Sequence, residues 1–339
     1  MKALALFSGG LDSLLAIKLI QEAGVEVEAV NFLQPFLTPA EEEKRLAHLQ
    51  KLIAQLGVKL HIVRLGEDYL RILESPKHGY GKAANPCLDC HIFFLRKAGE
   101  MMDALGAAFL VTGEVVGQRP KSQYRGAFPK IDEETGLAGL IVRPLSARLL
   151  PPTIPEEKGW ISLDHCPSIQ GRQRKIQLEL AAKYGLEYEA PAGGCLLTNV
   201  EYGRKVKDLI KADGHLTVDG LRLLRIGRHF RLSPHFKAIV GRNLRENRTL
   251  FRYFYQQRHT EGVYLLKALG APGPLTLGLG KPTADDLKTL ARITARYSDH
   301  PWTTPVTVKI LASGQEHHRT TVSVAKEQGA LDLEQFRIT

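Results

Sequence analysis

The feature of this sequence that most limits its fold is a regular alternation of short apolar segments with helical ones. Strands are predicted at residues 2–7, 25–32, 59–65 and 107–113. Between them, helical spacing of apolar residues predicts helices at 12–24, 40–57 and 90–106. Such alternation is typical of a parallel sheet that helices cover on both faces. Ligands of these sheets bind beyond the carboxyl ends of the strands, so residues at those ends are the first candidates for function.

The pattern changes in the second half of the chain. A segment rich in proline and arginine at 143–155 is followed by a predicted basic helix at 171–185. Beyond about residue 200 come a basic helix, mixed segments and two late strands, at 307–312 and 319–325. We therefore predict an α/β domain with a parallel sheet over 1–199, and a smaller basic α+β domain over 200–339.

Composition excludes several classes of protein. The chain has 339 residues, of which 44% are hydrophobic and 24% charged, close to the average for soluble globular proteins. No segment approaches the roughly 18 apolar residues of a membrane span, and the first apolar run is too short for a signal peptide. Four cysteines are too few for a disulfide scaffold. The sequence therefore predicts a soluble cytoplasmic protein.

The basic residues are concentrated in one stretch. The formal net charge is +10, and residues 201–260 hold 14 Lys or Arg against 5 Asp or Glu. A solvated basic surface is one interpretation of this stretch. The segregation favours a polyanionic partner, and no amphipathic segment with a large apolar face points to a membrane surface instead.

The segment SGGLDS, residues 8–13, lies between the first strand and the first helix. Its glycines allow the backbone to approach an anion, and the helix N-terminus offers N–H groups to phosphate. A magnesium ion would explain a carboxylate, Asp12, beside phosphates. The alternative is an ordinary turn in which Ser or Asp caps the helix. Neither the Walker pattern nor the dinucleotide-binding G-x-G-x-x-G is present.

This segment matches the SGGxDS signature of the PP-loop ATP pyrophosphatases. The resemblance implies an adenine nucleotide alpha hydrolase-like fold, binding of ATP, and adenylation of a carbonyl oxygen with release of pyrophosphate. Residues 110–123 resemble a segment of the tRNA 4-thiouridine synthetases that lies near the nucleotide. The residues that these resemblances place at ATP or its Mg²⁺ are Ser8, Gly9, Gly10, Asp12, Ser13, Gly113 and Gln118.

Two cysteines, Cys87 and Cys90, form a Cys-x-x-Cys pair after a long loop. Buried inert thiols, a structural zinc, a redox dithiol and an iron–sulfur cluster are all possible interpretations. Cys195 is about 105 residues further along, yet it leaves the same side of the predicted sheet. Cys166 matches no motif and is predicted to be a packing residue.

Several thiolation enzymes of the PP-loop group carry a Cys-x-x-Cys pair and one distant cysteine. Cys87, Cys90 and Cys195 match that pattern. The resemblance implies that they hold a [4Fe-4S] cluster with one open iron, which can bind the transferred sulfur. Persulfide and disulfide chemistry on the same cysteines, without a cofactor, is the first alternative, and zinc or no metal is the second.

The basic stretch contains arginines that suit RNA phosphates, and residues 228–247 resemble the RNA-binding module of the NFACT proteins. Spacing by three residues predicts that the first of these arginines align on a helix. Nearby aromatics, Phe230, Phe236, Tyr253 and Phe254, suit stacking on unpaired bases, or alternatively form a core beneath a charged surface. The candidate RNA contacts are Arg222, Arg225, Arg228, Arg231, Arg242 and Arg245.

Together these resemblances predict an ATP-dependent tRNA sulfurtransferase acting on uridine, with tRNA and a donor of sulfide or persulfide as partners. The predicted catalytic residues are Asp12, Cys87, Cys90 and Cys195. 4-Thiouridine at position 8 is the first candidate product, and 2-thiouridine at a wobble position is the second. The alternatives are a PP-loop ligase or amidating enzyme acting on a small molecule, and an RNA-binding protein with a degenerate nucleotide site.

Overall fold

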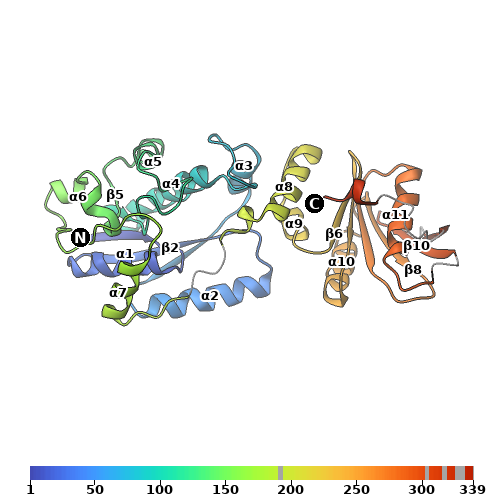
Figure 1. The fold of residues 1–339 in the computed structure, drawn as a ribbon, viewed down its shortest axis with the longest axis horizontal. Coiled ribbons are helices and arrows are strands. Elements are labelled where there is room, and N and C mark those ends of the chain that lie inside the picture. The colour runs from blue at the N-terminus through green and yellow to red at the C-terminus, as the bar shows by residue number, and fades with distance from the viewer. Residues whose placement is uncertain (190–193, 302–304, 315–318, 325–332, 339) are drawn as a thin grey trace. The chain divides into compact units, whose positions relative to one another are not determined.

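A computed structural model of the chain describes residues 1–189, 194–301, 305–314, 319–324 and 333–338. The chain divides into two compact units, Met1–Thr198 and Asn199–Thr339, which we call the N-terminal and C-terminal units (Figure 1). None of the described helices combines the length and the apolar composition that crossing a bilayer requires.

The N-terminal unit is built around a five-stranded sheet with the order β3-β2-β1-β4-β5, in which every neighbouring pair is parallel. Its strands are β1 (Lys2–Leu6), β2 (Glu26–Leu33), β3 (Leu60–Arg64), β4 (Phe109–Val111) and β5 (Ile141–Val142). Its helices are α1 (Leu11–Glu22), α2 (Pro39–Ala54), α3 (Glu67–Glu74), α4 (Cys87–Leu105), α5 (Ala127–Thr135), η1 (Pro144–Leu149), α6 (Ile154–Glu157), α7 (Lys175–Tyr184) and η2 (Leu196–Thr198).

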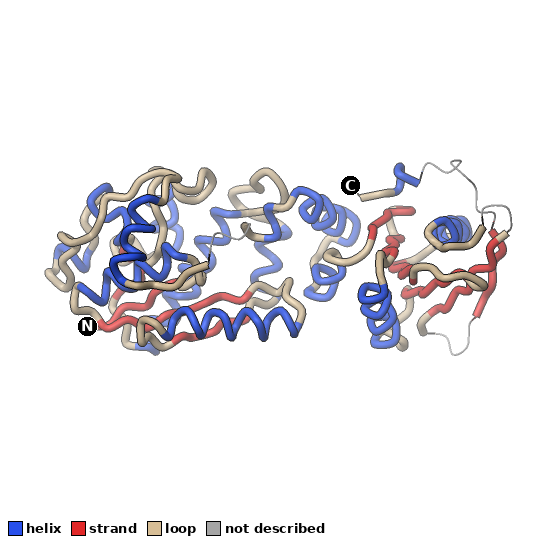
Figure 2. The backbone as a smooth tube through the Cα atoms, turned by 60° about the horizontal axis from the view of Figure 1, so that its bottom comes forward, coloured by secondary structure: helices blue, strands red, loops and turns tan. Residues whose placement is uncertain are grey.

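Helices cover both faces of this sheet (Figure 2). Successive side chains of a strand point to opposite faces, so Ala3 and Ala5 of β1 pack with α1, α2 and α7. Leu4, between them, packs with α4 and α5 on the other face. The predicted parallel α/β sheet is therefore confirmed. The proline-rich segment 143–155, for which no helix was predicted, contains η1 and α6.

The C-terminal unit contains a six-stranded antiparallel sheet with the order β11-β10-β8-β9-β7-β6. Its strands are β6 (Arg228–Ser233), β7 (Phe236–Val240), β8 (Val263–Ala268), β9 (Leu275–Gly280), β10 (Val306–Ala312) and β11 (Arg319–Val324). Its helices are α8 (Val200–Asp213), α9 (Val218–Leu223), α10 (Leu244–Gln256), α11 (Ala284–Arg296) and η3 (Leu333–Phe336). The core residues of α11 pack on one face of the sheet, and those of α10 on the other.

Two predictions about this unit are wrong. The arginines at 222, 225 and 228 do not share a helix, because α9 ends at Leu223 and β6 begins at Arg228 after a left-handed Gly227 (φ 72°). The side chains of Phe230 and Phe236 are fully buried and Phe254 is nearly so. These three aromatics form the core of the unit, so they cannot stack on bases without unfolding it.

Candidate active site

The phosphate-loop segment, residues 8–13, lies where β1 ends and α1 begins. Gly10 is the N-cap of α1, and no side chain caps the helix, which excludes the interpretation as an ordinary Ser- or Asp-capped turn. Ser13 Oγ instead donates to the Gly10 carbonyl (2.8 Å), and Ser8 Oγ accepts from the Gly10 N–H (3.3 Å). An uncapped helix N-terminus leaves its first N–H groups and its partial positive charge to an anionic ligand.

Asp12 lies in the first turn of α1 with a side chain that is only 14% exposed. Its Oδ2 accepts a hydrogen bond from Gln118 Nε2 (3.0 Å) and lies 3.6 Å from Arg174 Nη2. Its Oδ1 is buried and has no hydrogen-bond partner within the described part of the chain. Buried polar atoms are rarely left without a partner, so an orphaned carboxylate oxygen beside a phosphate loop fits a ligand of Mg²⁺.

Gly113 brings the segment after β4 against the first turn of α1. A Cβ atom at this position would lie 2.6 Å from both the carbonyl carbon and the carbonyl oxygen of Asp12. Only glycine therefore allows the approach that puts Gln118 within reach of Asp12. Gly113 and Gln118 both lie beside the phosphate loop.

Arg45 of α2 is a basic residue at this loop that sequence analysis missed. Its Nη2 donates to the carbonyl oxygen of Ser8, and its guanidinium also lies beside Gly9. Partial burial lowers the pKa of Arg45, and the charge of Glu189 works in the opposite direction. Across the described residues, no carboxylate lies within ion-pair distance of this guanidinium. No motif marks Arg45, because the α2 face that meets the loop is set by packing.

The three candidate cysteines lie near one another. Helix α4 begins at Cys87, three residues before the predicted start, so Cys87 and Cys90 both lie in its first turn. The segment that carries Cys195 is joined to the loop before α4 by a hydrogen bond from Ala84 N to Leu197 O (3.2 Å). The pKa of Cys90 is raised to about 12, chiefly by burial and also by the charges of Cys195 and Cys87, against the hydrogen bond to Tyr69, which lowers it. Burial also raises the pKa of Cys195, and the charge of Cys87 acts in the same direction.

Each of these thiols has a polar partner. Asn85 Nδ2 donates to Cys87 Sγ (3.1 Å), Gln34 Nε2 donates to Cys195 Sγ (3.6 Å), and the buried Tyr69 hydroxyl lies 3.5 Å from Cys90 Sγ. In the described residues, no three His, Cys, Asp or Glu side chains are placed to hold a single metal ion. Cys166, by contrast, is 2% exposed and packs in the core between the sheet and α1.

A buried ionic network lies behind the site. Glu114 accepts from Arg143 Nε (2.9 Å) and pairs with His91 Nδ1 (2.7 Å), and Arg143 also donates to both carboxylate oxygens of Asp132. Burial would raise the pKa of Glu114, but the charge of Arg143 and the bond to His91 outweigh it and lower the pKa to about 2. Because His91 follows Cys90, this network fixes the cysteine helix against the end of β4. Glu114 lies in the segment 110–123, whose resemblance drew attention to Gly113 and Gln118, but the sequence assigned no role to Glu114.

The loop at residues 117–123 joins the phosphate loop to the cysteines. Gln118 bonds to Asp12, and the charge of Arg119 lowers the pKa of Cys195 against the effect of burial. Pro120 and Lys121 line a pocket together with Cys87. One short loop therefore contacts Asp12 and lies beside Cys87.

Most of the candidate RNA-binding arginines have partners inside the C-terminal unit. Arg231 binds both oxygens of Asp208, and Arg242 binds Glu246. Arg222 lies 3.8 Å from Asp219, and Arg228 lies over the ring of Tyr297. Arg245 is exposed on α10. Arg225 lies between α9 and β6.

The exposed face of α10 carries a basic and aromatic surface that sequence analysis did not single out. Phe251 and Tyr255 are 45% and 48% exposed, and their ring centroids lie 4.5 Å apart. Arginines at i, i+3 and i+7 surround them on the exposed side of the helix. We call these residues the α10 surface: Arg245, Arg248, Phe251, Arg252 and Tyr255.

Two family models match the chain. Residues 1–147 match the family described as thiamine biosynthesis protein (ThiI), and residues 227–334 match the NFACT protein RNA binding domain. The tRNA-specific 2-thiouridylase MnmA of Campylobacter concisus is 32% identical over 122 residues, which are 34% of this chain and 35% of the relative. A probable tRNA sulfurtransferase of a Thermoanaerobacter species is 33% identical over 121 residues, 34% of this chain and 30% of the relative. The chain thus spans about a third of the length of these curated relatives.

Solved structures give more distant matches. A 4-thiouridine synthetase in complex with RNA and ATP is 24% identical with a TM-score of 0.35, over 54% of this chain and 50% of that one. The U34-tRNA thiolase NcsA of Methanococcus maripaludis is 16% identical with a TM-score of 0.34, over 66% and 73%. By these matches, residues 1–147 are similar to the ThiI family and residues 227–334 to the NFACT RNA-binding domain.

Proposed function

We propose that this protein is an ATP-dependent tRNA sulfurtransferase that replaces a uridine carbonyl oxygen with sulfur. The observation that carries the proposal is the loop at 117–123, which joins an uncapped phosphate loop to three neighbouring thiols in one unit. The names of the relatives that match the N-terminal unit, a tRNA 2-thiouridylase and a probable tRNA sulfurtransferase, support the same activity.

The phosphate loop is the proposed site of ATP. The N–H groups at the start of α1 bind phosphate oxygens, with Ser8, Gly9, Gly10 and Ser13 forming the loop around them. The orphaned Oδ1 of Asp12 binds Mg²⁺, while Gln118 holds the other oxygen in place. Arg45 supplies a positive charge to the phosphates on the side of the loop that faces α2.

The proposed reaction has two steps. A uridine carbonyl oxygen is a poor leaving group, so it first attacks the α-phosphate of ATP, and pyrophosphate departs with the electron pair of the broken bond. A sulfur nucleophile then attacks the ring carbon that carries this oxygen, and AMP leaves with the oxygen. The positive charges of Arg45 and of the α1 N-terminus stabilise the negative charge that develops on the departing pyrophosphate.

The three cysteines are the proposed ligands of the [4Fe-4S] cluster that the sequence resemblance implies. Three thiolates bind three different irons, so their sulfurs need not converge on a single point. Cys87 and Cys90, at the N-terminal end of α4, would bind it together with Cys195, and the donors of Asn85 and Gln34 would stabilise the negative charge on sulfur. When bound, such a cluster offers an open iron to the sulfide that is transferred.

Burial of Cys90 disfavours a free thiolate on this residue. With a pKa of about 12, its thiol is protonated at neutral pH, and the protonated thiol is a poor nucleophile. Coordination to a metal removes the thiol proton.

The C-terminal unit is the proposed site of tRNA binding, and the α10 surface is its proposed contact. Its arginines suit phosphates, and its two exposed rings suit unpaired bases. We propose 4-thiouridine at position 8 as the product, with 2-thiouridine at a wobble position as the second choice, and sulfide or a persulfide carrier as the sulfur donor.

The test is to incubate an unmodified tRNA transcript anaerobically with the protein, Mg-ATP and sulfide, and to analyse the nucleosides by mass spectrometry. We expect 4-thiouridine and one pyrophosphate released for each sulfur incorporated. 2-Thiouridine would change the target but keep the activity. Pyrophosphate release that depends on a small carboxylate, without thiolation, would contradict the proposal in favour of a ligase.

A further inference from the structure

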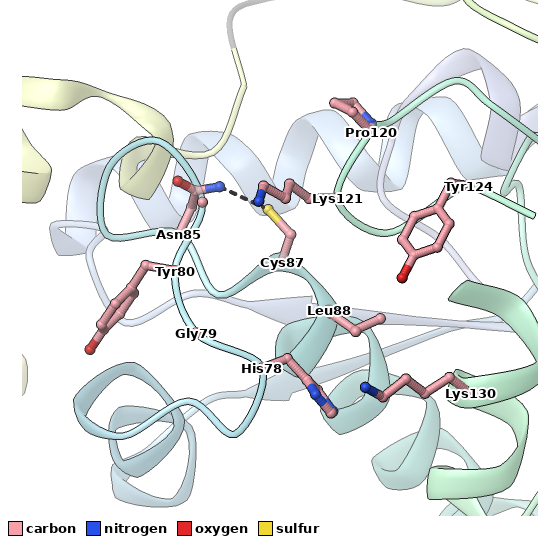
Figure 3. Close-up of a pocket in the computed structure, with 11 residues that line it drawn as sticks. His78, Gly79, Tyr80, Asn85, Cys87, Leu88, Pro120, Lys121, Tyr124 and Lys130 are labelled. Carbon is pink, nitrogen blue, oxygen red and sulfur yellow. Dashed lines mark hydrogen bonds between the residues drawn. The ribbon is translucent and has the colours of Figure 1, made fainter. Parts of the chain in front are cut away.

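A pocket of about 310 Å³ opens beside Cys87 in the N-terminal unit (Figure 3). One wall comes from the loop before α4 and from the start of α4 itself. The other wall comes from the end of the 117–123 loop and from α5. Its lining includes Leu88, Pro120, Lys121, Tyr124 and Lys130. No residue of the phosphate loop lines this pocket, so it is a separate feature at the cysteines.

The charge of the pocket is positive. Lys121 and Lys130 line it and form no ion pair with any described residue, and no Asp or Glu lines it. The nearby carboxylates have other partners: Asp89 accepts from the backbone N–H of His78, and Glu134 pairs with Lys77 and with the ring of His78. Two ammonium groups without a carboxylate predict an anionic ligand.

The pocket also offers flat apolar surfaces. Tyr124 is 45% exposed, and Pro120 and Leu88 lie on the same lining. The volume lies near the lower end of the roughly 300–1,000 Å³ that small-molecule pockets have. A single nucleotide combines an anionic phosphate with a flat base, and proteins bind unpaired nucleotides with basic side chains and exposed aromatic rings.

On the basis of the proposed function, we propose that this pocket holds the nucleotide next to the target uridine in single-stranded form. Its phosphate lies between Lys121 and Lys130, and its base lies against Tyr124. The location supports this assignment. Cys87 belongs both to the pocket and to the proposed sulfur site, and the 117–123 loop both lines the pocket and bonds to Asp12 through Gln118. A target uridine that reaches both ATP and the cysteines would place the adjacent RNA nucleotide beside the cysteines. Enzymes that act on extruded bases read flanking nucleotides in this way.

The test measures binding of a tRNA transcript to the full chain at several salt concentrations. A single-stranded phosphate contact contributes about 0.7 to the slope of log affinity against log salt concentration. Because both lysines face one phosphate, the double variant Lys121→Gln, Lys130→Gln should bind with a slope shallower by about 0.7. Tyr124→Ala should weaken binding by about fivefold or more at an unchanged slope, and Tyr124→Phe should restore it.

The matched control is Lys44→Gln, Lys59→Gln, which removes two exposed lysines of the same unit away from the pocket and should leave the slope unchanged. Melting temperatures establish that each variant is folded. A folded pocket variant with wild-type slope and affinity overturns the proposal. A second result would also overturn it: thiosulfate protects Cys87 of the wild type from an alkylating reagent but does not protect it in a pocket variant that binds tRNA normally. The pocket would then take a small sulfur anion. If the wild-type chain binds no tRNA, the proposed function itself fails. If the wild type binds tRNA and the pocket variants bind it equally well, only the pocket proposal fails.

Discussion

Gln118 Nε2 donates a hydrogen bond of 3.0 Å to Oδ2 of Asp12, across 106 residues of sequence. The bond fixes one carboxylate oxygen and leaves the other, Oδ1, buried without a partner in the described structure. A buried carboxylate with one satisfied oxygen costs free energy unless a cation completes it. The arrangement of Gln118 and Asp12 therefore suits the proposed Mg²⁺ ion, which would arrive with ATP.

Replacing Asp12 by Asn should abolish most ATP turnover while the fold is kept. The amide retains the size of the side chain but binds Mg²⁺ poorly, and metal-assisted charge stabilisation contributes several kcal/mol. We expect pyrophosphate release to fall by about 100-fold or more. The control is Asp103→Asn, an exposed residue at the end of α4. Wild-type rates in Asp12→Asn would remove the magnesium assignment.

Gly113→Ala tests the close approach of the segment after β4 to the first turn of α1. Its methyl group would lie 2.6 Å from backbone atoms of Asp12, which no side-chain rotation can relieve. Overpacking of this kind costs about 1–3 kcal/mol, and the displaced α1 should also bind ATP more weakly. Urea denaturation and nucleotide titration measure the two effects. Gly66→Ala is the matched control, because nothing lies within 4 Å of its added Cβ. Equal stability of the two variants would argue against the contact.

Glu114→Gln should destabilise the N-terminal unit at neutral pH, because Arg143 would keep its buried charge with a weaker partner. Breaking a buried ion pair costs about 3–5 kcal/mol. The pKa of Glu114 is lowered from 4.5 to about 2, so its stabilising effect is complete above about pH 4.5 and is lost as the pH falls toward 2. The difference in unfolding free energy between wild type and variant should narrow over that range. A difference independent of pH would show that the carboxylate charge is not the cause.

The three cysteines should act as a set. Cys87→Ala, Cys90→Ala and Cys195→Ala should each lose bound iron and acid-labile sulfide together with thiolation. Cys166→Ala should keep both, because this thiol packs in the core. Iron and sulfide analysis of anaerobically purified protein measures the outcome. Retention of a full cluster in any one of the first three variants would contradict the assignment.

The α10 surface should account for part of the salt dependence of tRNA binding. Removing two phosphate contacts with Arg245→Gln and Arg248→Gln should make the slope shallower by about 1.4–1.8. Nucleotide binding in the N-terminal unit should not change. Lys281→Gln with Lys288→Gln, two exposed lysines of the same unit outside this surface, is the control. If both pairs change the slope equally, binding depends on net charge and not on α10.

The sequence by itself determined the features that depend on neighbouring residues. Apolar alternation predicted the parallel sheet, because a strand between two helical layers must be apolar on both sides. The phosphate loop was recognisable because its glycines and the helix that follows are contiguous. Cys87 and Cys90 were a recognisable pair for the same reason, because only two residues separate them.

Tertiary structure decided which distant residues meet. Arg45 reaches Ser8, and Glu114 reaches Arg143, only because separate elements pack on one sheet. In the C-terminal unit the composition indicated a basic surface, but burial selected the partners: Arg231 pairs with Asp208, and Phe230 fills the core. A charge or a ring in the sequence shows what a side chain can bind. Whether it faces solvent or another side chain depends on packing between segments that local pattern does not relate.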